Sequence, residues 1–296
     1  MSKGLRYLCL AGVSAIMLFE HLQLMSYIKK ATKPDADDWN SSARSAFDGL
    51  KSIALRFTGD SFFAIYIISC IVSFLTFAIY IAFSKKIHEA NKSESPLRYL
   101  IWFVEYIIYG IGFVPMIGAL AEVQYCNSHD IDSYHSVSCW GKKQMALIEV
   151  GFVFSSFAFF ISAVVLPALK SERNGVEKRW GDECYFFGFD RILLVGIIYL
   201  LAPIRLPWVG ILLTCVLIAY IVIFECYNEL HIASLKVGLL CGQAWLFLCA
   251  DEADNNGNTA SDLMAGWIPA ILIGYSLLWI KSLVFKRKYK GIPLQK

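Results

Sequence analysis

Apolar residues gather in eight long stretches that are separated by short polar segments. A helix that crosses about 30 Å of hydrocarbon needs about 20 consecutive, mostly apolar residues. Each of these stretches reaches or approaches that length. The pattern therefore predicts an all-α, polytopic transmembrane bundle of about eight membrane helices, at residues 5–28, 62–83, 99–121, 145–169, 184–204, 208–227, 232–250 and 263–285.

The positions of Lys and Arg predict the orientation of these helices, because short basic loops stay on the cytoplasmic side. Segments 84–98 and 170–183 are rich in Lys and Arg, and so is the tail at 286–296. Loop 122–144 has its two lysines at its very end, and the acidic loop 251–262 has four acids and no base. We assign the first three segments to the cytoplasm and the two loops to the opposite side. An even number of crossings then places both termini in the cytoplasm.

The first loop, residues 29–60, fits this scheme less well, because parity places it outside although it carries six basic residues and five acids. Within it Phe47, Leu50 and Phe57 recur at helical spacing, which is typical of an interfacial helix on the bilayer or of a short helix that caps the bundle. The preceding apolar stretch is too long and too polar for a signal peptide, so we interpret it as a retained anchor.

The composition excludes a soluble enzyme. Apolar and aromatic residues make up 57% of the 296 residues and charged residues 17%, and the mean hydropathy is +0.54. The net charge of +3 is too small to indicate a nucleic-acid surface. The chain contains no His-Glu-x-x-His, Gly-x-Ser-x-Gly or phosphate-loop motif. We therefore expect one membrane domain over residues 1–296, without catalytic activity, a bound metal or another cofactor.

Loop 122–144 contains two cysteines, Cys126 and Cys139, which the topology places in an oxidising compartment. A disulfide between them is the favoured interpretation. A metal site is the alternative, since His129, Asp130, Asp132 and His135 lie in the same loop, although the spacing matches no known zinc module. Asn40 begins an Asn-Ser-Ser sequence and is the predicted glycosylation acceptor on the outer side.

Ionisable residues inside apolar helices are costly and mark candidate functional positions. Glu105 and Glu149 could form a proton or cation relay, or could act as polar pins between helices, and for Glu105 the second interpretation is favoured. The adjacent Asp190 and Arg191 are predicted to lie partly buried near the inner boundary, with at least one of them paired to another helix. The intramembrane polar candidates are Glu20, His21, Glu105, Glu149, Asp190 and Arg191, and two further charged residues, Glu225 and Lys236, lie near the inner ends of their helices.

Small residues four apart allow helix backbones to approach closely in lipid. The seventh stretch contains Gly238 and Gly242, and the eighth contains Ala270 and Gly274. We interpret this spacing as helix packing inside the bundle, with contact between subunits as the alternative.

From Arg98 onward the chain resembles the multi-pass region of TmcB/TmcC-like membrane proteins of ciliates and amoebae. The resemblance covers about two thirds of the chain, and it rests on Pro115, Cys126, Cys139-Trp140, Asp190-Arg191, Tyr227-Asn228, Gly238, Trp245 and Gly266-Trp267-Ile268-Pro269. Two features depart from that family: Gly141-Lys142-Lys143-Gln144 follows Cys139-Trp140, and no large cytoplasmic sensory region is present. The resemblance implies a reduced membrane module, and it carries over no catalytic residue.

The sequence thus favours a non-enzymatic multi-pass protein of the secretory pathway or cell surface. It would act as a subunit of a larger membrane assembly or as the membrane module of a sensor. Its expected partners are the lipid bilayer and other membrane subunits, or further copies of itself. The alternative function is an ion channel or transporter that uses Glu105 and Glu149.

Overall fold

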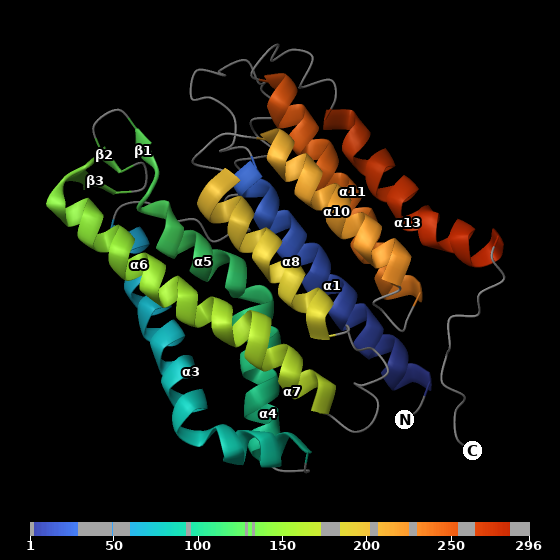
Figure 1. Ribbon diagram of the computed structural model, residues 1–296, viewed down its shortest axis with the longest axis horizontal. Helices are drawn as coiled ribbons and strands as arrows, with labels where there is room; N and C mark the ends of the chain where they lie inside the picture. The colour runs from blue at the N-terminus through green and yellow to red at the C-terminus, as the bar shows by residue number, and fades with distance from the viewer. Residues whose placement is uncertain are drawn as a thin grey trace.

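A computed structural model shows a bundle of helices that run along one common direction, with a small sheet at one end (Figure 1). The bundle is almost entirely helical, which confirms the predicted helical class. The structure describes residues 3–28, 49, 60–92, 96–127, 130–131, 134–172, 184–201, 207–224, 230–253 and 264–284.

The first half of the chain forms helices that cross the bundle in alternating directions (Figure 1). Helix α3 bends near its end at Phe83, whose backbone leaves the helical region with φ −126° and ψ 20°. A π-helical segment, η2, follows α4, and another, η3, lies between α6 and α7. The elements are α1 (Lys3–Ile28), α3 (Asp60–Lys92), α4 (Pro96–Phe103), η2 (Val104–Ile111), α5 (Phe113–Glu122), α6 (Lys142–Phe160), η3 (Ile161–Val165) and α7 (Leu166–Glu172).

The second half continues the same up-and-down arrangement (Figure 1). Helix α11 lies at its centre and packs most extensively on α13, then on α10 and on α1. The elements are α8 (Cys184–Gly196), the π-helical η5 (Ile197–Leu201), α10 (Pro207–Phe224), α11 (Leu230–Ala253), the short 3₁₀ turn η6 (Met264–Gly266) and α13 (Trp267–Val284).

Four described helices are long and apolar enough to cross a membrane, namely Asp60–Lys92, Lys142–Leu169, Leu230–Glu252 and Trp267–Val284. The pair Pro96–Ile111 and Phe113–Glu122 counts as a fifth span if it is taken as one broken helix. The stretch Pro207–Ile223 of helix α10 forms a shorter apolar helix. The structure therefore shows four to five candidate spans, fewer than the eight that the sequence pattern predicts.

The predicted continuous helix at 99–121 is wrong in one respect, because the chain bends by 52° between η2 and α5. The bend occurs at Gly112, whose N–H donates to the carbonyl of Ile107, five residues back, at 2.9 Å. A Cβ at Gly112 would lie 2.7 Å from the carbonyl oxygen of Ile108. Only glycine allows this approach without a shift of the backbone, so the bend follows from one small residue that the apolar pattern conceals.

A three-stranded antiparallel sheet in loop 122–144 was not predicted. Its strands, in the order β1-β2-β3, are β1 (Cys126–Asn127), β2 (Asp130–Ile131) and β3 (Tyr134–Ser138). Such short strands lack a hydrophobic alternation long enough to be recognised in the sequence. The sheet leads through an exposed Trp140, with a φ of 62°, into the start of α6.

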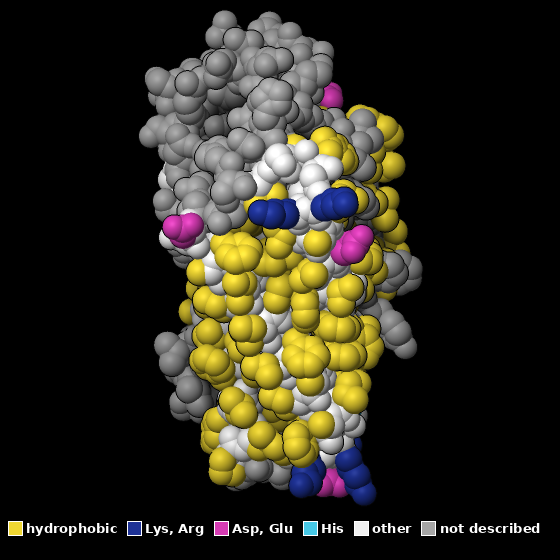
Figure 2. Space-filling view, turned by 90° about the vertical axis from the view of Figure 1, so that its left-hand side faces the viewer, with side chains coloured by type: hydrophobic (Ala, Val, Ile, Leu, Met, Phe, Trp, Pro, Cys, Tyr) yellow, Lys and Arg dark blue, Asp and Glu magenta, His cyan; other side chains and the backbone are white. Residues whose placement is uncertain are grey.

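Apolar side chains cover the face formed by the left-hand side of Figure 1, and charged side chains lie at both ends of that apolar zone (Figure 2). Helix α3 contributes exposed Ile67, Ile71 and Phe74, and α6 contributes Phe152 and Val153.

At the start of α6, Lys142 and Lys143 are exposed beside Trp140. An apolar belt bounded by Lys and Trp is typical of a surface that faces lipid.

Candidate functional site

Four charged side chains meet inside the bundle, where α1, α8 and α11 come together. They are Glu20 on α1, Asp190 and Arg191 on α8, and Lys236 on α11. Glu20, Asp190 and Arg191 are buried, and Arg191 is only 3% exposed. Buried charges are strongly unfavourable unless they are paired and hydrogen-bonded, so the geometry of the pairing determines what this cluster does.

Arg191 forms an ion pair with Glu20, in which the guanidinium donates to the carboxylate Oε1. The guanidinium carbon also lies 4.7 Å from the centre of the Phe113 ring, at the start of α5. A cation over an aromatic face gains further stabilisation when water is excluded. Arg191 therefore ties α8 to both α1 and α5.

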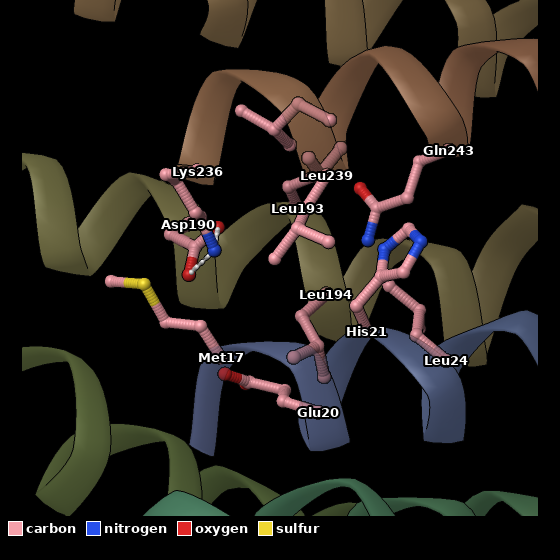
Figure 3. A pocket seen from close by; sticks show the side chains of 11 residues that line it. Met17, Glu20, His21, Leu24, Asp190, Leu193, Leu194, Lys236, Leu239 and Gln243 are labelled. Atoms are coloured by element: carbon pink, nitrogen blue, oxygen red, sulfur yellow. Dashed lines mark hydrogen bonds and ion pairs between the residues drawn. The ribbon is translucent and has the colours of Figure 1, made fainter. Parts of the chain in front are cut away.

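Asp190 pairs with Lys236 on α11, whose ammonium lies 2.7 Å from one carboxylate oxygen and 2.8 Å from the other (Figure 3). The two residues of α8 therefore face different neighbours, and each has a partner of opposite charge. This agrees with the prediction that at least one of them pairs with another helix. With two acids and two bases, the four side chains have no net charge.

The lysine and the two acids line a small cavity of about 20 Å³ together with His21 and Gln243 (Figure 3). This volume is about that of one water molecule. Both ring nitrogens of His21 are buried and have no hydrogen-bond partner among the described residues, and the same holds for Oε1 of Gln243. The His21 ring also stacks on Trp267, with 5.9 Å between ring centres and 5° between ring planes.

The two glutamates of the transport alternative lie in different environments. Glu105, on η2, is buried and 4% exposed, whereas Glu149, on α6, is exposed. Glu149 lines a groove between α6 and the α8–η5 segment, and Glu105 does not contribute to that groove. The structure thus does not bring these two carboxylates together.

The small residues of the last two long helices lie where α11 and α13 cross. A Cβ at Gly238 would lie 2.7 Å from the carbonyl oxygen of Ile271, and one at Gly242 would lie 2.7 Å from the Ile271 side chain. A Cβ at Gly274 would lie 2.6 Å from the Cys241 sulfur. Ala270 is partly buried on the same helix. The glycines therefore serve packing within the chain, which is the interpretation that the sequence favoured.

Among the described cysteines, Cys70, Cys215, Cys241 and Cys249 are free. The side chain of Cys126 lies outside the described residues, so its pairing with Cys139 stays a prediction. In the described part of the chain no group of three or more His, Cys, Asp or Glu side chains could hold a metal ion.

Several sequence predictions fall on residues outside the described ranges. These are the glycosylation acceptor Asn40, nearly all of loop 29–60 with its interfacial helix, most of the acidic loop 251–262 and the basic tail 286–296. Sequence reasoning did not identify Gln243 or Phe113 as parts of the buried cluster. Their residue types gave no signal, because one Gln and one Phe in apolar helices are unremarkable until the helices are assembled.

The four charged side chains pair with one another, and the cavity that His21 lines is about the size of one water molecule. In comparisons with known proteins, the chain matches no family model, no curated protein and no solved structure.

Proposed function

We propose that this chain is a non-enzymatic, multi-pass membrane protein that acts as a subunit of a larger membrane assembly or as the membrane module of a sensor. The observation that carries the proposal is the pairing of Glu20 with Arg191 and of Asp190 with Lys236 across three helices. A conducting path needs polar groups at successive depths along a hydrated route. The four charged groups of the buried cluster instead bind one another in two ion pairs.

The outward face of α13 supports the role of a subunit. Only 11% of this helix is buried, and Ile268, Leu272 and Ile273 are among its many exposed apolar residues. Helix α13 packs chiefly on α11, through the glycine contacts described above. A helix held along one side presents its remaining apolar surface to lipid or to another membrane helix.

The proposed topology has eight passes with both termini in the cytoplasm. In its support, α1, α3, α4–α5, α6–α7, α8, α10, α11 and α13 alternate in direction along the bundle (Figure 1). Basic Lys85, Lys86 and Lys92 lie at the opposite end of the bundle from the sheet. The sheet would then face the lumen of the secretory pathway or the cell exterior, where a disulfide at Cys139 is stable.

A kinship with the TmcB/TmcC-like proteins would fit this proposal, since that resemblance concerns a multi-pass membrane region. Under it, the present chain would supply the membrane part and a partner would supply any sensory output.

A flux assay on the purified protein tests the proposal. The natively extracted oligomer, reconstituted in liposomes, should pass protons, Na⁺ and K⁺ no faster than liposomes without protein. A cation or proton flux that is abolished by Glu105→Gln in a folded protein would contradict the proposal and support transport.

Co-purification tests the assembly itself. Mild extraction from the native membrane followed by mass spectrometry should recover the chain in a stoichiometric complex with other membrane subunits or with itself. Cysteines placed at Leu272 or Ile273 should crosslink to that partner, whereas a cysteine at Ile68 on α3 provides the exposed apolar control. Recovery of a monomer without crosslinks at α13 would contradict a subunit role through this face.

A further inference from the structure

A second feature of the molecule, separate from the buried charge cluster, is the groove between α6 and the α8–η5 segment. It has a volume of about 660 Å³, within the range of sites that hold small organic ligands. One wall is a helical stripe of α6 that includes Glu149, Phe152 and Phe159. The other wall is a stripe of α8 and η5 that includes Ile192 and Gly196.

The groove has a polar end and an apolar end. Ser155 and Tyr199 form a hydrogen bond between their hydroxyl groups across the two walls, which fixes the antiparallel register of the stripes. Glu149 and Gln124 lie toward the end at which α6 begins. Phe159 lies ten residues further along α6, about 15 Å away at 1.5 Å per residue, on the side of Ile192. The lining therefore suits an amphiphile that lies along the bundle.

The position of Glu149 indicates which polar group a ligand of this groove would carry. It lies seven residues after Lys142, about 10 Å along the helix from the exposed lysines and Trp140 that mark the membrane interface. A carboxylate at this depth is costly unless it accepts hydrogen bonds. It would repel the phosphodiester of a phospholipid, whereas an uncharged hydroxyl could donate to it.

The apolar walls indicate the shape of the rest of the ligand. Phe152 is 64% exposed and lines the groove, and Phe159 lies seven residues on, on the same face of α6. Opposite them, a Cβ at Gly196 would have no atom within 4 Å, so the wall is open there. Flat aromatic surfaces facing an uncrowded wall suit a rigid, planar ring system better than a flexible acyl chain, because a rigid ligand loses less conformational entropy on binding.

We propose that this groove binds a sterol, with the sterol hydroxyl donating to the carboxylate of Glu149 and the ring system lying between Phe152 and Gly196. The proposal depends on the membrane location of the chain and not on its membership of an assembly.

The test uses the full-length protein in phospholipid nanodiscs that contain a photoreactive sterol. Labelling should saturate, should fall on peptides that cover residues 149–159 and 192–199, and should be competed at least tenfold better by unlabelled sterol than by the same hydrocarbon without its hydroxyl. Labelling that does not saturate, or that spreads equally over α3 and α13, would overturn the proposal.

Two variants with a matched control sharpen the test. Gly196→Leu should fill the groove and reduce saturable labelling at least tenfold. Gly12→Leu is the control, since Gly12 is also a helical glycine with no atom within 4 Å of a Cβ, and it should leave labelling unchanged. Glu149→Leu should abolish the preference for the hydroxylated sterol.

Native mass spectrometry distinguishes a bound sterol from a bound phospholipid. A phospholipid retained in place of sterol by the unmodified protein, and lost in Gly196→Leu, would show that the groove binds an acyl chain and would overturn the assignment to sterol. Retention of sterol at one per chain would support it. Circular dichroism and a single elution peak establish that each variant is folded.

Discussion

At the scale of single residues, Arg191 is a buried charge that depends on its partners. It is buried, pairs with Glu20 and lies over the ring of Phe113. Removal of one partner from a buried pair leaves an uncompensated charge, which costs about 3–5 kcal/mol. The contribution of Arg191 to stability is therefore much larger than that of an exposed lysine such as Lys143.

We predict that Arg191→Leu lowers the melting temperature and the folded yield in detergent far more than Lys143→Leu does. The physical reason is the carboxylate of Glu20, which loses its cation in a buried site. Thermal unfolding followed by fluorescence or by size-exclusion chromatography measures the effect. The double variant Arg191→Leu with Glu20→Gln should recover part of the loss, and equal stability of both single variants would show that the pair is not buried.

The second ion pair permits an independent test. Lys236→Met should destabilise the protein because Asp190 then loses both of its close contacts with the ammonium. Adding Asp190→Asn should restore stability, since an amide in that position carries no charge. A double-mutant cycle on melting temperature measures the coupling between the two positions. Additive effects would show that Asp190 and Lys236 do not interact in the folded protein.

The sequence predicted that Asp190 and Arg191 form buried pairs, but it did not predict their partners. The adjacent opposite charges of Asp190 and Arg191 in an apolar run indicated buried pairing, because an isolated charge in lipid is unstable. Which residues would pair with them could not be predicted. Glu20 lies 171 residues away from Arg191, and only the assembly of α1, α8 and α11 makes them neighbours.

At the scale of helices, close packing depends on a few glycines. The crossing of α11 and α13 has no room for a Cβ at Gly238, which would lie 2.7 Å from a backbone oxygen of α13. In lipid, the association of helices depends on such close backbone approach, because lipid tails are as apolar as the side chains. The spacing of small residues allowed this contact to be predicted, whereas the bend at Gly112 gave no comparable pattern.

We predict that Gly238→Leu separates α13 from α11 and lowers the melting temperature by several degrees. The same substitution at Gly12 is the control, because a Cβ at that exposed helical position contacts no other atom. Thermal unfolding of both variants in the same detergent provides the comparison. If the two variants unfold at the same temperature, the α11–α13 contact does not limit stability.

The three-stranded sheet leads to a prediction about the disulfide. We expect Cys139 to pair with Cys126, which closes a ring of 14 residues and stabilises the folded chain by about 3 kcal/mol in the chain-entropy model. Peptide mapping without reduction should recover one crosslinked peptide that contains both residues. Recovery of Cys126 as a free thiol, or of Cys139 joined to a second chain, would contradict this pairing.

At the scale of the whole molecule, the helices alternate in direction, so successive loops lie at opposite ends of the bundle (Figure 1). The structure shows four to five candidate spans, and the proposed eight-pass topology adds α1, α8–η5 and α10 as crossings. Helices α1 and α8 carry buried charges, and α10 is short. Mean hydropathy alone therefore underestimates the number of helices that cross the membrane. Glu20 and Arg191 each interrupt an apolar stretch. The bundle can still bury both residues, because they pair with each other.

The eight-pass topology predicts that the two ends of the bundle lie on opposite sides of the membrane. Single cysteines at Lys86, near the end of α3, and at Lys142, at the start of α6, would report the two ends. In sealed vesicles of known orientation, a membrane-impermeant thiol reagent should label position 86 only from the cytoplasmic side and position 142 only from the other side. Because α4–α5 is bent by 52°, this pair also tests whether the bent segment crosses the membrane or re-enters it. Labelling of both positions from one side would show a re-entrant loop. That result would leave an odd number of crossings and place the N-terminus and C-terminus on opposite sides.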